Sequence, residues 1–277
     1  MEEKNMKKKI TLVATSVLLV AAMVIGGTLA YFTDTKDQTN TFTVGNVKIT
    51  LDEQDVNNPK ARTEDDQTYG TLNPGKYFVK DPTITVNEGS QDAYIFMDIT
   101  MNKYKSLAPV MALDAAADAS ISYTQQDVDA CMKDNKFSTQ AFLQQMQTNP
   151  DVFRAIVNKW FVGIEHANWE VCGIFYNVDK EDTAAEGNWM TIRLAYIGAG
   201  DAVMSAKENV KFMNEFGMPA SVTQEMLDNG LTTNQFNEGD PFQMKFTAYA
   251  IQEDTIEDVD AAFTALFGDL GSYWTQW

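Results

Sequence analysis

The sequence predicts an all-β protein, an antiparallel β-sandwich with helical insertions. Several segments alternate apolar and polar residues with a period of two, which is typical of strands that bury one face. Short turn signals separate these segments, and they favour an antiparallel sandwich over a parallel sheet. Stretches with helical periodicity interrupt the strands, and we interpret their apolar stripes as packing against the sheet.

Four segments carry the clearest strand patterns. Residues 188–197 and 242–250 each have one apolar and one polar face, whereas residues 92–101 are apolar on both faces and predict a strand covered on both sides. In residues 41–51 the alternation changes phase at Gly45, which indicates a bulge or bend. The turn signals Asn73-Pro74-Gly75 and Asn87-Glu88-Gly89-Ser90 bracket a further expected strand over residues 77–86.

Three helices are predicted from capping signals and apolar spacing. Asn149 as N-cap with Pro150 at the first helical position begins one, with its stripe ending at Phe161. A capping-box spacing from Ser221 begins a second, which ends at Gly230. Residues 255–267 form the third, ended by Gly268, and residues 114–146 are interpreted as a mixed helical insertion.

Residues 1–30 differ in composition from the rest of the chain. Four lysines precede an apolar run, and the small residues Thr28 and Ala30 stand three positions and one position before Tyr31. This pattern predicts a secretory signal peptide cleaved after Ala30. The alternative is an uncleaved membrane anchor, because the run approaches the roughly 18 to 20 residues that a bilayer requires.

The expected organisation follows from that cleavage. We divide the chain into a signal peptide over residues 1–30, an N-terminal segment over 31–40, and a main domain over 41–277 with a mainly helical insertion at about 104–187.

The chain is strongly acidic, with 39 Asp+Glu against 21 Lys+Arg among 277 residues and a formal net charge of -18. This balance excludes a general nucleic-acid binder, which needs clustered Lys and Arg to neutralise phosphates. Removing residues 1–30 takes away four Lys and two Glu, so the exported part carries 17 Lys+Arg, 37 Asp+Glu and a net charge of -20. The acidic runs are interpreted as solvated loops, although weak Ca²⁺ binding or a glycosidase pair stays open.

Two cysteines, Cys131 and Cys172, lie 41 positions apart. Export permits a disulfide between them, and the sequence leaves both the paired and the unpaired form open. Two cysteines cannot replace a hydrophobic core in a domain of this size, so apolar burial must hold it together.

No catalytic motif emerges from the sequence. A zinc protease of the common kind needs two His one helical turn apart and a Glu, whereas this chain has only His166, near Glu165 and Glu170. The nucleophile elbow Gly-x-Ser-x-Gly, the phosphate loop and the dinucleotide-binding glycine motif are absent from the sequence as well. We therefore expect no catalytic residue, no metal and no cofactor.

Five stretches of the sequence carry a resemblance to known proteins: Gly26-Gly27-Thr28-Leu29-Ala30-Tyr31-Phe32-Thr33-Asp34, Phe42-Thr43-Val44-Gly45-Asn46-Val47, Leu72-Asn73-Pro74-Gly75, Lys80-Asp81-Pro82-Thr83-Ile84-Thr85-Val86 and Phe246-Thr247-Ala248-Tyr249-Ala250-Ile251-Gln252. Through these stretches the chain resembles the TasA/camelysin family of exported Gram-positive proteins. Roughly residues 104–187 lie outside it.

This resemblance implies a jelly-roll sandwich, processing by a SipW-type signal peptidase, and secretion to the extracellular matrix or cell surface, where subunits polymerise head to tail into biofilm fibres. It also implies that residues 31–40 act as a donor strand for the next subunit, with Phe32 as an apolar anchor, Tyr31 at its start and Phe42 as a second anchor. Other matrix proteins are further potential partners. The alternatives are a monomeric exported binding module or adhesin and a camelysin-like metalloprotease.

Overall fold

A computed structural model describes residues 33–37, 40–43, 46–67, 69, 72–102, 104–134, 136–176, 190–198, 202–231 and 242–268. The predicted cleavage residues Thr28, Ala30 and Tyr31, and the predicted anchor Phe32, lie outside these ranges. Within the described ranges, none of the helices combines the length and apolar character needed to cross a bilayer.

The larger β-sheet forms one layer of the molecule. Among the described residues it has seven strands in the order β11-β12-β7-β16-β1-β2, with β13 pairing beside β7, and every pairing is antiparallel. These strands are β1 (Thr33–Asp37), β2 (Asn40–Thr43), β7 (Ala93–Met101), β11 (Trp169–Tyr176), β12 (Met190–Tyr196), β13 (Val203–Met204) and β16 (Met244–Gln252).

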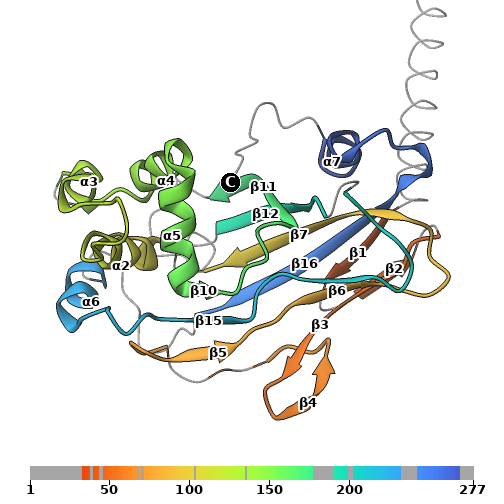
Figure 1. Ribbon diagram of the computed structural model, residues 1–277, viewed down its shortest axis with the longest axis horizontal. Helices are drawn as coiled ribbons and strands as arrows, with labels where there is room; N and C mark the ends of the chain where they lie inside the picture. Colours follow the sequence, from red (N-terminus) through yellow and green to blue (C-terminus); the bar gives the residue numbers. More distant parts are fainter. Residues whose placement is uncertain are drawn as a thin grey trace, which may run out of the picture.

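Two smaller antiparallel sheets form the facing layer (Figure 1). One has the order β14-β6-β3-β4 and the other β10-β15-β5. Their strands are β3 (Ile49–Asp55), β4 (Asn58–Thr63), β5 (Tyr77–Val79), β6 (Thr83–Val86), β10 (Phe161–Val162), β14 (Asn209–Lys211) and β15 (Glu215–Gly217). The all-β antiparallel sandwich predicted from the alternating patterns is confirmed.

The main core lies between the two layers. Ile95, Met97 and Ile99 of β7 and Ala248 of β16 are buried there against Ile49 of β3 and residues of β6. Because side chains alternate along a strand, the even-numbered residues of β7 face the other way. That second face is also buried, as the sequence predicted, because α7 (Val259–Phe267) packs on it through Phe263.

Four helices follow β7, at one end of the sandwich (Figure 1). They are α2 (Tyr104–Ala116), α3 (Gln125–Ala130), α4 (Thr139–Thr148) and α5 (Pro150–Trp160), with the small hairpin β8 (Met132–Lys133) and β9 (Lys136–Phe137) between them. In the range of about 104–187 expected to be mainly helical, the described residues are helical up to Trp160 and then form β10 and β11. The helix α6 (Gln224–Leu231) packs beside α2.

Three predicted boundaries differ from the structure. The single strand expected over 77–86 is divided into β5 and β6, which belong to different sheets, and Pro82 lies between them without a backbone donor. The N-cap of α7 is Asp258, whose carboxylate accepts from the Ala261 amide at 2.8 Å, whereas Thr255 ends a separate 3₁₀ turn (Glu253–Thr255). Thr223 rather than Ser221 accepts from the first turn of α6.

Candidate assembly interface

The N-terminal segment pairs with β16, and among the described pairings of the large sheet this one joins the residues farthest apart in the sequence. Four register pairs join β1 to β16: Thr33↔Ile251, Asp34↔Ala250, Thr35↔Tyr249 and Lys36↔Ala248. On its other side β16 pairs with β7 along its whole length. Figure 1 shows β1, from the start of the chain, lying beside β16, from near its end.

The strand β2 continues the sheet beyond β1. Its residue Phe42, which the sequence predicted as a second anchor of the donor strand, is the register partner of Thr35. The structure therefore places the described part of the predicted donor segment in a hairpin on the edge of its own sheet. Without β1, the peptide groups of β16 on that side would be open to another strand.

The opposite edge of the same sheet is less suited to strand addition. It is formed by β11, whose register against β12 shifts between Val171 and Gly173. The bulge leaves Cys172 out of the regular ladder, and bulges on edge strands disfavour pairing with a further chain. The β16 side is accordingly the edge that best accepts an added strand.

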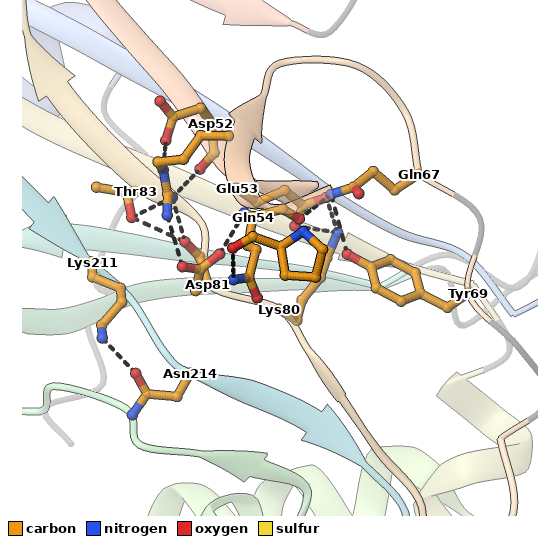
Figure 2. Close-up of polar contacts among 12 residues, drawn as sticks. Asp52, Glu53, Gln54, Gln67, Tyr69, Lys80, Asp81, Thr83, Lys211 and Asn214 are labelled. Atoms are coloured by element: carbon orange, nitrogen blue, oxygen red, sulfur yellow. Dashed lines mark hydrogen bonds and ion pairs between the residues drawn. The ribbon is translucent and has the colours of Figure 1, made fainter. Parts of the chain in front are cut away.

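A polar cluster supports β16 from the facing layer (Figure 2). Lys80 Nζ donates to the carboxylate of Glu53 at 2.7 Å, and both side chains are largely buried. The ammonium group also lies 5.0 Å from the ring centre of Tyr69 and 5.2 Å from that of Phe246 on β16. Lys80 therefore connects β3 with the strand that receives β1.

Tyr69 completes this cluster. Burial, followed by the negative charge of Glu53, raises the pKa of the Tyr69 hydroxyl well above its usual value. The phenol consequently stays protonated throughout the physiological range.

Arg62 fixes the neighbouring β3–β4 hairpin to the start of β6. Its guanidinium pairs with Asp52 at 2.5 Å and with Asp81 at 2.8 Å, and it donates to the hydroxyl of Thr83 at 2.8 Å. Figure 2 shows Asp52, Asp81 and Thr83 gathered around a common point. The stretch Lys80-Asp81-Pro82-Thr83 therefore contributes to two neighbouring charged clusters. Lys80 pairs with Glu53, whereas Asp81 and Thr83 bind Arg62.

The other face of β16 carries a second charged pair. Tyr249 donates to Asp98 at 3.1 Å, and Asp98 accepts two hydrogen bonds from Arg193 at 2.7 Å each. The sequence reasoning missed Asp98, although a carboxylate inside a strand predicted to be buried on both faces is a signal for a buried partner. Buried ion pairs therefore lie on both faces of the sheet at β16.

The residues around His166 do not fit a zinc site. His166 Nε2 lies 2.8 Å from Asn158 Oδ1, and Glu165 accepts from the amide of Asn168. Burial, followed by the charge of Arg154, lowers the pKa of His166. Among the described residues, no group of three or more His, Cys, Asp and Glu side chains is placed to hold a metal ion.

Both cysteines are buried and free. Cys131 belongs to an apolar cluster among the helices α2 to α5, whereas Cys172 lies beneath α7. The disulfide that the sequence left open is thus not formed in this structure. Burial is the largest cause that raises the pKa of each thiol, which makes both poor nucleophiles.

Residues 5–105 match the family model of the camelysin metallo-endopeptidases. No curated protein and no solved structure matches. The matched range covers the predicted signal peptide and the strands β1 to β7, and so includes the N-terminal segment and the Lys80 cluster. This match confirms the resemblance drawn from the sequence motifs over residues 5–105, where the chain is similar to the camelysin family.

Proposed function

We propose that the exported chain, residues 31–277, is a structural protein that polymerises head to tail into extracellular matrix fibres. In the fibre, β1 of one subunit pairs with β16 of the next. The observation that carries the proposal is the position of β1, which follows the predicted cleavage site directly and fills the edge of β16 over four residue pairs.

The same pairing can form within one chain or between two chains. The hydrogen bonds of an exchanged strand are those of the closed monomer, so exchange requires only that the connection to β2 and β3 opens. A repeated, directional exchange of this kind generates a filament rather than a closed dimer. Cleavage by a SipW-type signal peptidase would release the donor segment from the membrane, and other matrix proteins would be its partners outside the cell.

Cysteine trapping tests whether β1 of one chain pairs with β16 of another in the register of the monomer. In a Cys131→Ala, Cys172→Ala background, one chain carries Asp34→Cys and a second carries Ala250→Cys. These two positions are register partners, so mixing the chains should give disulfide-linked species whose yield rises with fibre formation. The matched control replaces Ala250→Cys with Ala248→Cys, which is two residues out of register and should link far less.

Deleting residues 31–40 tests the requirement for the segment. The truncated protein should keep its β-rich circular dichroism spectrum but form no fibres in negative-stain electron microscopy. Fibres of unchanged appearance would overturn the proposal.

A monomeric exported binding module or adhesin is the second candidate. It is favoured by the fact that β1 closes the β16 edge of its own chain. Sedimentation separates the two, because a cleaved protein that stays monomeric at high concentration supports the adhesin. The name of the matched family also brings metallo-endopeptidase activity into consideration, and casein cleavage that is lost on His166→Ala would support it.

A further inference from the structure

The helices α2, α4 and α5 and the large sheet, together with Phe161 of β10 and Phe216 of β15, line an apolar cavity of about 70 Å³. Its walls include Leu107, Phe142 and Val157 on α2, α4 and α5, and Ile99 and Leu194 on β7 and β12. None of the lining residues belongs to β1 or β16. The cavity is therefore separate from the proposed assembly edge.

An apolar cavity is a suitable site for a small hydrophobic molecule. The wall atoms lose dispersion contacts when nothing fills the space, so a filling molecule stabilises the fold. An engineered cavity of about 150 Å³ in another protein binds benzene. Benzene has six non-hydrogen atoms, so this cavity, at about half that volume, suits a molecule of about three or four non-hydrogen atoms.

One polar group in the wall points to the chemistry of the ligand. Trp160 is only 1% exposed, and its buried Nε1–H has no hydrogen-bond partner in the part of the chain that the structure describes. Trp169 also lines the cavity, but its Nε1–H donates to the Lys211 carbonyl at 3.3 Å. A buried N–H without an acceptor is uncommon and destabilising, so an acceptor near Trp160 would be favourable.

We propose that this cavity binds a small, mainly apolar molecule that carries one hydrogen-bond acceptor, which pairs with Trp160 Nε1–H. Acetone is a representative of this class. A water molecule is a poorer occupant, because a buried water needs two to four polar partners. The polar side chains of the wall other than the two tryptophans are those of Tyr104, Thr139 and His166, and His166 is already bonded to Asn158.

Two probes of nearly the same shape test the acceptor. Acetone and isobutene each have four non-hydrogen atoms, but only the ketone has an acceptor oxygen. Each is titrated into the purified protein labelled with ¹⁵N-tryptophan, and the indole cross-peaks are followed by NMR. The Trp160 cross-peak is identified by its loss in Trp160→Phe. We expect it to shift saturably with the ketone, which should bind roughly five-fold more tightly than the alkene.

Two further variants locate the binding. Val157→Leu adds a methylene group inside the cavity and should abolish the binding of both probes. Its matched control is Val128→Leu, a buried valine on α3 that does not line the cavity, and this variant should bind both probes normally. Trp160→Phe, followed through the Trp169 cross-peak, should bind both probes with equal affinity.

The alternative outcomes overturn the proposal. An absence of saturable shifts in the unmodified protein would mean that the cavity holds no ligand or water only. Equal affinity for the two probes in that protein would remove the role of Trp160. Binding that survives Val157→Leu would place the probes elsewhere.

Discussion

Arg193 and Asp98 form a two-pronged ion pair on the face of the large sheet beneath α7. Nε and Nη2 of the arginine donate to the two carboxylate oxygens, each at 2.7 Å. Their side chains are 13% and 7% exposed. The guanidinium carbon lies 3.5 Å from the ring centre of Phe267 on α7. The pair thus joins the central strand β7 to its neighbour β12 and to the helix that covers them.

Breaking this pair from one side should be costly. Arg193→Met leaves the buried Asp98 carboxylate without its cation, with the Tyr249 hydroxyl still donating to it, and we expect the free energy of unfolding to fall by about 3 to 5 kcal/mol. The double variant Arg193→Met, Asp98→Leu should lose less, because it buries no unpaired charge. Urea unfolding followed by circular dichroism measures both. If the free energy of unfolding of Arg193→Met lies within about 1 kcal/mol of that of the unmodified protein, the ion pair does not stabilise the fold as described.

Lys80→Met should also destabilise the sandwich, by about 3 kcal/mol, because it leaves Glu53 buried without its cation. Adding Glu53→Gln should recover part of the loss. The matched control is Lys207→Met, which removes an exposed pair with Glu88 and should change the free energy of unfolding by less than about 1 kcal/mol. If the two lysine variants unfold at the same urea concentration, the Lys80 cluster does not support β16 as described.

Glu170 on β11 should make stability depend on pH. Burial, followed by the negative charge of Asp260 on α7, raises the pKa of this carboxyl in the folded protein. Because this pKa is higher in the folded protein than in the unfolded chain, protonation of Glu170 stabilises the fold. This contribution is fully present below the pKa of the unfolded state and is lost as pH rises through the pKa of the folded state. Glu170→Gln should therefore raise the melting temperature at pH 7 and leave it nearly unchanged at pH 3.

The control for that measurement is Glu225→Gln on the surface of α6, which should show no such pH-dependent gain. A melting temperature for Glu170→Gln that rises equally at both pH values would rule out ionisation of Glu170 as the cause.

The two thiols should react only after unfolding. Cys131 and Cys172 are free and buried, and burial raises the pKa of each. Incubation of the native protein with iodoacetamide should leave both unmodified, whereas denaturation without reductant should allow two alkylations, counted by mass spectrometry. Denatured protein that takes up no label would instead reveal a disulfide.

The net charge of -20 on residues 31–277 should keep the proposed fibres apart. Salt screens this repulsion and a fall in pH toward 4 reduces it, so fibres should bundle more under either condition. Turbidity and electron microscopy measure bundling, and bundling that is independent of both salt and pH would count against electrostatic repulsion.

Local patterns in the sequence were sufficient to predict most of the elements. The alternation in residues 188–197 and 242–250 predicted β12 and β16, and the Asn149-Pro150 signal predicted α5. These predictions succeeded because one buried face imposes a period of two on a strand, and because a proline suits the first turn of a helix. The family motifs likewise lie in short, contiguous stretches.

The sequence by itself therefore determined the fold class, the net acidic charge and the resemblance to the TasA/camelysin family. Only the tertiary structure decided which residues far apart in the chain meet. Asp98 and Arg193 are 95 positions apart, and β1 meets β16 across most of the chain. Trp160 and the cavity depend on how a helical layer packs on a sheet. Such contacts follow from strand order and packing, which residue spacing alone does not encode, because the same local pattern is compatible with many partners.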